Sequence, residues 1–205
     1  MTLKGLLVVI SAPSGGGKTT LCHNLMAADD RLTRALTCTT RAPRPGELNG
    51  SDYFFLAPDD FERRVAAGEF LEHAVVHGQR YGTLRREVLE RLRAGRDVLL
   101  AIDVQGAGVI REEARRDTDV AAALVTVFYV PGSLEILEDR LCGRGTEDEE
   151  TRRRRLAAAR GEVARWTEFD YLVVSGSMTD DVERLREILA AERMRTHRQP
   201  APWSL

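Results

Sequence analysis

The chain has 205 residues, of which 43% are hydrophobic and 30% are charged, and its formal net charge is −2. This length and composition are typical of one folded, water-soluble domain with a substantial core. The balanced charge gives no reason to expect nucleic acid or an anionic membrane as a partner, and no apolar stretch is long enough to span a bilayer. The three scattered cysteines (Cys22, Cys38 and Cys142) form no recognisable disulfide framework, so we expect a cytoplasmic protein.

A glycine-rich loop lies near the start of the chain, where residues 11–20 read SAPSGGGKTT. The apolar residues 6–10 before it predict a buried strand, and residues 18–29 after it predict a helix. A strand, a glycine-rich loop and a helix in this order are the context of a phosphate-binding P-loop. The glycines allow backbone N–H groups to point at phosphate oxygens, and the helix N-terminus adds partial positive charge.

The P-loop hypothesis assigns a role to Lys18, which would reach the β- and γ-phosphates, and to Thr19, whose hydroxyl would bind Mg²⁺. Ala12 stands where the general pattern has its first glycine. The alternative is a glycine-rich turn that binds nothing. Only Lys4 and Lys18 are lysines among 30 basic residues, so a lysine at this position is unlikely to be chance.

A second basic segment spans residues 36–56, which read LTCTTRAPRPGELNGSDYFFL. We expect strands at residues 36–40 and 53–56, with the two prolines between them stiffening the chain. Arg41 and Arg44 would then be held close together, as a clamp for a second anion. The alternative is a solvated basic turn.

The rest of the chain alternates strands and helices, which predicts a parallel α/β sheet. A lobe of mixed structure, residues 36–93, interrupts this pattern. In it we expect a helix at 59–67, a strand at 70–76, a turn at 78–83 and a helix that ends at Gly95. Further buried strands are expected at 98–102, 124–130 and 171–174, with a final helix at 180–194 and a disordered tail from Thr196.

Two further features concern charge. Asp103 ends an apolar strand, as the acid of a Walker B strand does, although it could instead cap the next helix. Residues 143–146 read GRGT and precede acidic and then basic residues, which predicts a helix to about residue 166. This segment could be a mobile, arginine-bearing lid over a triphosphate, or simply a salt-bridged surface.

Several motifs together make the chain resemble the guanylate kinase family over about residues 5–195. They are SAPSGGGKTT (11–20), TTRAPRPGE (39–47), DYFF (52–55), EFLEHA (69–74), YGT (81–83), IDVQGA (102–107) and RLCGRGTEDEE (140–150). The resemblance implies one P-loop NTPase domain: a parallel sheet core flanked by helices, an inserted mixed α/β lobe that binds the monophosphate, and a helical lid. The implied boundaries are 1–35, 94–139 and 167–195 for the core, 36–93 for the lobe, 140–166 for the lid and 196–205 for the tail.

The resemblance also implies the substrates, ATP with Mg²⁺ and GMP, and a set of site residues. The ATP phosphates would be held by Ala12, Pro13, Ser14, Gly15, Gly16, Gly17, Lys18 and Thr19. GMP would be held by Thr37, Arg41, Arg44, Tyr53, Glu72, Tyr81, Thr83 and Asp103. The residues that engage the transferring phosphate would be Lys18, Arg41, Arg140, Arg144 and Arg155.

The chemistry of Glu72 agrees with this resemblance. Guanine presents N1–H and N2–H₂ as neighbouring donors, and a carboxylate can accept from both. Adenine has an unprotonated N1 at that edge, which would repel a carboxylate. The resemblance therefore implies transfer of the ATP γ-phosphate to GMP or dGMP. The alternatives are a non-catalytic scaffold domain of the same type and a kinase for another phosphorylated acceptor.

Two positions depart from the family pattern. Ala101 stands where the family usually has an acid, and Ser175-Gly176-Ser177 replaces an Asn-Asp-Asp run. We expect activity to survive the first change, with altered Mg²⁺ dependence. The second leaves open how the chain contacts the adenine base. The sequence gives no indication of an oligomeric state.

Overall fold

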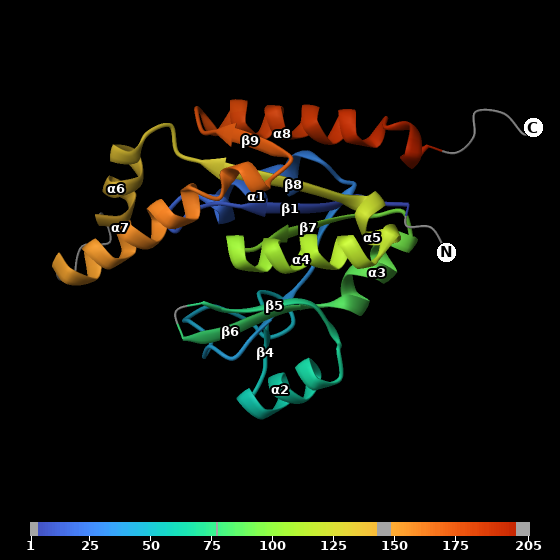
Figure 1. Cartoon of the computed structure of the whole chain (residues 1–205), viewed down its shortest axis with the longest axis horizontal. Coiled ribbons are helices and arrows are strands. Elements are labelled where there is room, and N and C mark those ends of the chain that lie inside the picture. The colour runs from blue at the N-terminus through green and yellow to red at the C-terminus, as the bar shows by residue number, and fades with distance from the viewer. Residues whose placement is uncertain (1–3, 77, 143–148, 200–205) are drawn as a thin grey trace, which may run out of the picture. The chain divides into compact units, whose positions relative to one another are not determined.

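The computed structural model describes residues 4–76, 78–142 and 149–199, which contain two β-sheets (Figure 1). The strand order is β2-β7-β1-β8-β9 in the first sheet and β4-β3-β6-β5 in the second. The chain divides into two compact units. Unit 1 comprises Met1–Leu7, Arg31–Leu100 and Gln105–Leu124, and unit 2 comprises Val8–Asp30, Ala101–Val104 and Val125–Leu205.

Unit 1 contains all four strands of the second sheet and the helices next to them in the chain. Its elements are β2 (Leu32–Arg34), β3 (Thr37–Thr39), β4 (Phe54–Phe55), α2 (Pro58–Ala66), β5 (Phe70–Val76), β6 (Gln79–Leu84), α3 (Arg85–Arg93), most of β7 (Asp97–Ala101), most of α4 (Val104–Arg116) and α5 (Thr118–Ala123).

Unit 2 contains the glycine-rich loop and the C-terminal part of the chain. Its elements are most of β1 (Leu7–Ser11), α1 (Lys18–Ala28), most of β8 (Leu124–Val130), α6 (Leu134–Cys142), α7 (Glu149–Val163), the 3-10 helix η1 (Trp166–Glu168), β9 (Tyr171–Val174), α8 (Met178–Arg193) and the 3-10 helix η2 (Thr196–Arg198).

The core of the second sheet forms where α2 packs on it. Pro58 starts this helix at a position where no N–H is needed, and acids in its first turn and arginines in its last turn complement the helix dipole. The helix buries Phe61, whose ring stacks on Phe70 of β5 with the ring centroids 4.5 Å apart. Cys38 of β3 completes this apolar cluster, and burial raises the pKa of its thiol to about 11.

The turn expected at residues 78–83 is wrong. Gly78 has a φ of +75°, but the following residues form the strand β6. This strand is antiparallel to β3 on one side and to β5 on the other, so that Tyr81 pairs with both Thr39 and Ala74. Pairing on both sides holds a polar, glycine-containing segment in an extended conformation that its composition does not favour.

The first sheet has the apolar strands that the sequence predicts, but β9, expected to be buried, is an edge strand that exposes Leu172 and Val174. All five residues of β1 are buried, and β8 pairs in parallel with β9. Two short elements had no sequence signal strong enough to be expected. The strand β2 pairs in parallel with β7, and α5 begins after Asp117, whose carboxylate caps two backbone N–H groups.

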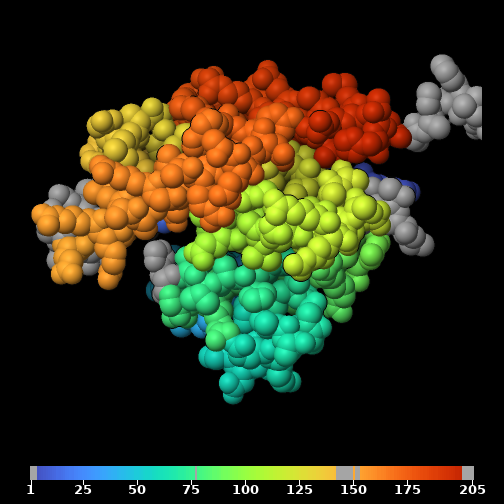
Figure 2. All heavy atoms as spheres, in the orientation of Figure 1, coloured from blue at the N-terminus to red at the C-terminus, as the bar shows by residue number. Residues whose placement is uncertain are grey.

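Helices α6 and α7 pack against each other in unit 2 and lie side by side at its surface (Figure 2). Leu137, Leu141 and Ala159 are buried between them, with Leu156 and Val163 packed alongside. Elsewhere in this unit α8 contacts both α1 and β9 (Figure 1). Within the described part of the chain, no helix combines the length and apolar character that crossing a membrane requires.

The tail expected to be disordered from Thr196 begins with an ordered turn, η2. Arg198 in this turn forms an ion pair and hydrogen bonds with Glu192, which also accepts a hydrogen bond from the Tyr171 hydroxyl. Burial would raise the pKa of Glu192, but its hydrogen bonds with Tyr171 and Arg198 lower it below the ordinary value. The buried Glu192 therefore gives η2 a specific partner within the fold.

A second buried acid, Asp181, joins three segments of unit 2. Its side chain is 0% exposed and accepts hydrogen bonds from the Tyr129 hydroxyl (2.7 Å), the Ser175 hydroxyl (2.8 Å) and the Gly176 N–H (2.9 Å). Burial would raise the pKa of Asp181, but these hydrogen bonds and the nearby charge of Arg184 lower it. The ionised carboxylate therefore stabilises the contact between β8, the end of β9 and α8.

We predict that Asp181→Ala lowers the free energy of unfolding by about 3 kcal/mol at pH 7, because it leaves buried donors without an acceptor. The folded pKa lies below the unfolded value of about 3.9, so the contribution is complete above that pH and is lost as the pH falls through the folded pKa. Urea unfolding at pH 7 and pH 3 would measure both effects. Glu187→Ala, an exposed acid on the same helix, is the control. An equal effect of the two substitutions would contradict the prediction.

Candidate functional site

The backbone of the glycine-rich loop has the form that anion binding requires. Gly15 and Gly17 have φ values of +79° and +91°, a region that side-chain-bearing residues rarely adopt. The Gly16 N–H donates to the carbonyl oxygen of Pro13 at 2.8 Å, which closes the turn. Gly17 caps α1, so the N–H groups of the first helical turn face the loop.

Close packing restricts the loop further. A Cβ atom at Gly15 would lie 2.8 Å from a methyl carbon of Leu141, and one at Gly17 would lie 3.4 Å from a guanidinium nitrogen of Arg140. Arg140 also donates to the carbonyl oxygen of Gly16 at 3.2 Å. The lid-side helix α6 therefore contacts the loop directly, through an apolar and a basic side chain.

The loop already donates to one anionic group. The N–H of Ser14 donates to a carboxylate oxygen of Glu162, on α7, at 2.8 Å. This carboxylate shows that the N–H points out of the loop toward an acceptor. The Lys18 ammonium donates to the carbonyl oxygen of Ile102 at 2.7 Å, which places it beside the end of β7.

Two further charged side chains belong to this part of unit 2. Asp103 is half-buried and directly follows Ile102, and α4 begins at the next residue. Arg165, which the sequence did not indicate, forms a double hydrogen bond with Glu168. That bond, with further contributions from Glu168 and Asp103, raises the pKa of Arg165, so its charge lies close enough to Asp103 to interact with it.

The lid arginines have different outcomes. Arg140 contacts the loop as described, and Arg155 is half-buried on α7. Arg144 lies outside the described residues, as does the GRGT segment.

One oxygen ligand in unit 2, the Thr19 hydroxyl, fits a magnesium ion carried by a nucleotide. Mg²⁺ prefers oxygen ligands and keeps several waters, so it needs few protein groups. The Thr19 hydroxyl is in an exposed residue at the start of α1, next to Lys18. It is the one group that the sequence assigned to the ion.

The second candidate site lies in unit 1, on one face of the second sheet. Strand register aligns Thr37, Thr83 and Glu72 in a row across β3, β6 and β5. Residues paired across neighbouring antiparallel strands face the same side. Glu72 is 2% exposed, and the Thr83 hydroxyl donates to its Oε1 at 2.6 Å. A carboxylate has about four acceptor positions, which is more than this one bond uses.

Arg41 is held rigidly next to this row. Its Nη2 donates to both oxygens of Glu47 at 2.9 Å, and its guanidinium lies 5.5 Å from the ring centroid of Tyr53 and 5.9 Å from that of Phe55. Burial lowers the pKa of Arg41, but its hydrogen bonds with Glu47 and Tyr81 raise it overall. Its buried Nε has no hydrogen-bond partner among the described residues, so a donor is available to an anion.

The other basic and aromatic residues of this site surround Arg41. The Arg44 N–H donates to Glu47 at 2.7 Å, and its side chain is exposed. This hydrogen bond and those from Arg41 lower the pKa of Glu47. The rings of Tyr53 and Tyr81 meet edge to face, with centroids 6.3 Å apart.

The described site residues that the sequence predicts are divided between the two units, and Asp103, which was expected with the GMP residues, belongs to the unit of the glycine-rich loop. Unit 2 holds the loop residues 12–19, Asp103, Arg140 and Arg155, and unit 1 holds Thr37, Arg41, Arg44, Tyr53, Glu72, Tyr81 and Thr83. Sequence reasoning missed the roles of Glu47, Glu162 and Arg165. Glu47 ends the TTRAPRPGE motif, so a signal existed for it, but Glu162 and Arg165 lie in a charged helical stretch that resembles an ordinary surface.

The positions that depart from the family pattern also have places in the structure. Ala101 is exposed at the end of β7. Ser175 and Gly176 donate to Asp181, and the Ser177 hydroxyl accepts from the Asp180 N–H at the start of α8. These three residues therefore organise the start of α8.

Comparisons with known proteins agree over almost the whole chain. The family model for guanylate kinase matches residues 4–192. Guanylate kinases of Novosphingobium aromaticivorans and Paramagnetospirillum magneticum are 44% and 45% identical over 196 residues, which is 96% of this chain and 86% and 89% of theirs. The crystal structure of guanylate kinase from Anaplasma phagocytophilum has a TM-score of 0.76 at 32% identity, over 97% of this chain and 91% of that one. The chain belongs to the guanylate kinase family.

Proposed function

We propose that this protein transfers the γ-phosphate of ATP to GMP, and to dGMP, giving ADP and GDP or dGDP. The observation that carries the proposal is the buried Glu72 carboxylate, aligned with two threonine hydroxyls in unit 1 of a chain whose unit 2 has a glycine-rich loop followed by Lys18 and Thr19. The glycine-rich loop suits the phosphates of a nucleoside triphosphate, and the Glu72 carboxylate with its two threonines suits a guanine base.

The P-loop would hold the donor phosphates. Backbone N–H groups of residues 12–19 would donate to the phosphate oxygens, and Lys18 would exchange the Ile102 carbonyl oxygen for the β- and γ-phosphates. Magnesium, held by the Thr19 hydroxyl and the phosphates, supplies charge neutralisation when it is bound. Arg140 lies against the loop and would balance charge that develops on the transferring group.

The face of the second sheet would hold the acceptor. Glu72 would accept from N1–H and N2–H₂ of guanine, Thr37 would donate to O6, and Thr83 would keep Glu72 in position. Arg41, with its free Nε donor, would bind the GMP phosphate together with Arg44, Tyr53 and Tyr81. Transfer requires the acceptor phosphate oxygen in line with the γ-phosphate, with water excluded.

The two alternatives explain less of the structure. A scaffold domain that only binds has no need for Lys18 and Thr19 at a loop with two left-handed glycines. A kinase for a sugar phosphate has no need for a buried carboxylate next to a phosphate clamp. The family membership and the residues of both sites support the enzyme.

A cytoplasmic location is part of the proposal. Cys22 and Cys38 are both buried free thiols, which is typical of proteins in a reducing compartment, where nucleotide pools are also found.

The first prediction concerns the reaction itself. With ATP and Mg²⁺, ADP formation should be rapid with GMP and dGMP and at least about 10³-fold slower, by kcat/KM, with AMP, UMP and CMP, because a site of paired hydrogen bonds rejects unmatched partners. A coupled assay of ADP release would measure this. Equal rates with all five acceptors would contradict the proposal, as would binding of GMP without turnover.

The second prediction concerns base choice. Glu72→Gln replaces one acceptor by a donor, so kcat/KM for GMP should fall by about 10²-fold while that for AMP rises or stays the same. Glu90→Gln makes the same change at an exposed position of α3 and should leave both values unchanged. Unchanged selectivity in the Glu72 variant would show that Glu72 does not recognise guanine.

The third prediction concerns the donor. Lys18→Met should reduce kcat by at least about 10²-fold, since it removes a charge that stabilises the transition state. The Kd for GMP, measured by calorimetry without ATP, should stay within twofold. A variant with normal kcat would show that the loop lysine takes no part in transfer.

A further inference from the structure

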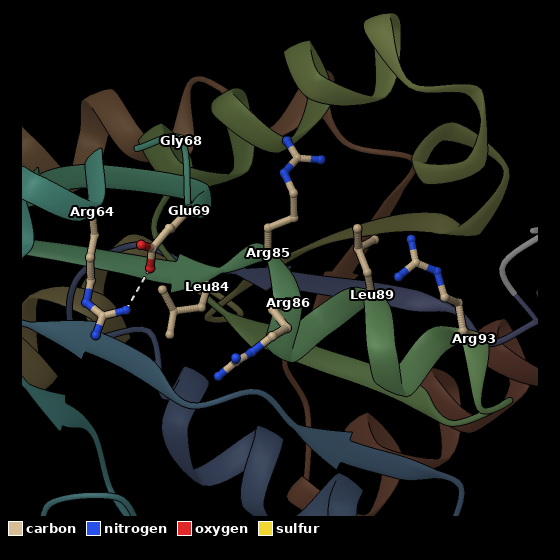
Figure 3. A pocket seen from close by; sticks show the side chains of 8 residues that line it. All are labelled: Arg64, Gly68, Glu69, Leu84, Arg85, Arg86, Leu89 and Arg93. Carbon is tan, nitrogen blue, oxygen red and sulfur yellow. Dashed lines mark hydrogen bonds and ion pairs between the residues drawn. The ribbon is translucent and has the colours of Figure 1, made fainter. Parts of the chain in front are cut away.

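A cavity of about 660 Å³ lies within unit 1 (Figure 3). Its lining contains four arginines, one acid, two leucines and a glycine: Arg64, Gly68, Glu69, Leu84, Arg85, Arg86, Leu89 and Arg93. These residues come from the end of α2, the start of β5, the end of β6 and helix α3. The volume falls within the range of about 300–1,000 Å³ that is usual for small-molecule sites.

Two of the four arginines are already neutralised. Arg64 forms an ion pair with Glu69 at 2.7 Å, within the cavity lining. Arg85 forms an ion pair with Glu113 of α4 at 2.5 Å. In Figure 3 the side chain of Arg85 points away from that of Arg86. These two guanidinium groups therefore add little net charge to the cavity.

The other two arginines, Arg86 and Arg93, are exposed and form no ion pair or hydrogen bond within the described residues. They lie on α3 at a spacing of seven residues, which is two turns, and in Figure 3 their side chains extend in opposite directions, so that they place positive charge at two parts of the cavity. Leu89 lies between them, and Glu90 on the same helix is exposed. The cavity thus has an excess of about two positive charges beside an apolar surface made by Leu84 and Leu89.

This cavity is separate from the acceptor site of the same unit. Leu84 pairs with Phe70, which faces α2, whereas Thr83 pairs with Glu72 on the row described above. Side chains alternate between the two faces of a strand, so Leu84 and Thr83 point to opposite sides of the sheet. A molecule in the cavity would contact the sheet on the side away from Glu72.

We propose that this cavity binds a small organic phosphomonoester, whose phosphate is attracted by the positive charge of Arg86 and Arg93 and whose organic group lies against Leu84 and Leu89. Two guanidinium groups match the two charges of a phosphomonoester near pH 7. The leucines favour an organic phosphate over inorganic phosphate, because the organic group covers apolar surface. The ligand would bind in addition to the nucleotide substrates.

The test is calorimetric titration with phenyl phosphate and, separately, inorganic phosphate. The full-length protein would first be saturated with GMP, Mg²⁺ and a non-hydrolysable ATP analogue, so that neither proposed substrate site can take the probe. We expect saturable binding of phenyl phosphate and at least about tenfold weaker binding of inorganic phosphate. Methyl NMR signals of Leu84 and Leu89 should shift during the titration with phenyl phosphate.

The double variant Arg86→Gln/Arg93→Gln should weaken phenyl phosphate binding by at least about tenfold, because it removes the two positive charges that attract the phosphate. The control Arg63→Gln/Arg116→Gln removes the same charge from exposed positions of unit 1 outside the cavity and should bind as the wild type does. Both variants should turn over GMP at the wild-type rate without added probe, so the result is independent of the proposed reaction.

Three outcomes would overturn the proposal. They are no saturable binding to the wild type, equal weakening in the cavity and control variants, and binding of inorganic phosphate as tight as that of phenyl phosphate. Failure of GMP turnover in the wild type would concern the proposed function alone, since binding in the cavity is measured separately from turnover.

Discussion

The left-handed backbone at Gly15 and Gly17 is the constraint on which the phosphate-binding half of this protein depends. It turns N–H groups outward, and residues with a side chain rarely adopt it. The packing of Leu141 and Arg140 against those same glycines joins this conformation to α6. The shape of the loop, the position of α6 and the location of the Lys18 ammonium therefore depend on one another. The buried strand β1 leads into this arrangement and supports it.

The proposed acceptor site in unit 1 depends on the register of its strands and not on the backbone conformation of a glycine. Three antiparallel strands place Thr37, Thr83 and Glu72 in one row, and a shift of one residue in β6 would turn Thr83 to the opposite face. Polar groups that are far apart in the sequence thus become one recognition surface. The Arg41–Glu47 pair adds a rigid cation beside it, with its guanidinium held between an acid and two aromatic rings.

Much of this could be predicted from sequence because the signals are local. Apolar strands, the glycine loop and the clustered motif residues each depend on near neighbours in the chain, and the family resemblance linked them. The strand β6 was not predictable, because its extended form comes from pairing on both sides and its composition resembles a turn. Glu162 and Arg165 were missed for a related reason: a charged residue on a helix gains its role only from what the fold places opposite it.

The hydrogen bond from Ser14 to Glu162 has a consequence for how tightly a phosphate is held. One N–H makes one strong hydrogen bond at a time, so a phosphate oxygen that takes it must displace the carboxylate. Glu162 is tethered, which gives it a high local concentration and makes it an intramolecular competitor. The apparent affinity for a phosphate at this N–H would then be the intrinsic affinity divided by a factor that the competing Glu162 carboxylate sets. A phosphate that took this N–H would also release the C-terminal part of α7 from its hydrogen bond to the loop, so that occupancy of the loop and the freedom of this helix would be coupled through one exchangeable bond.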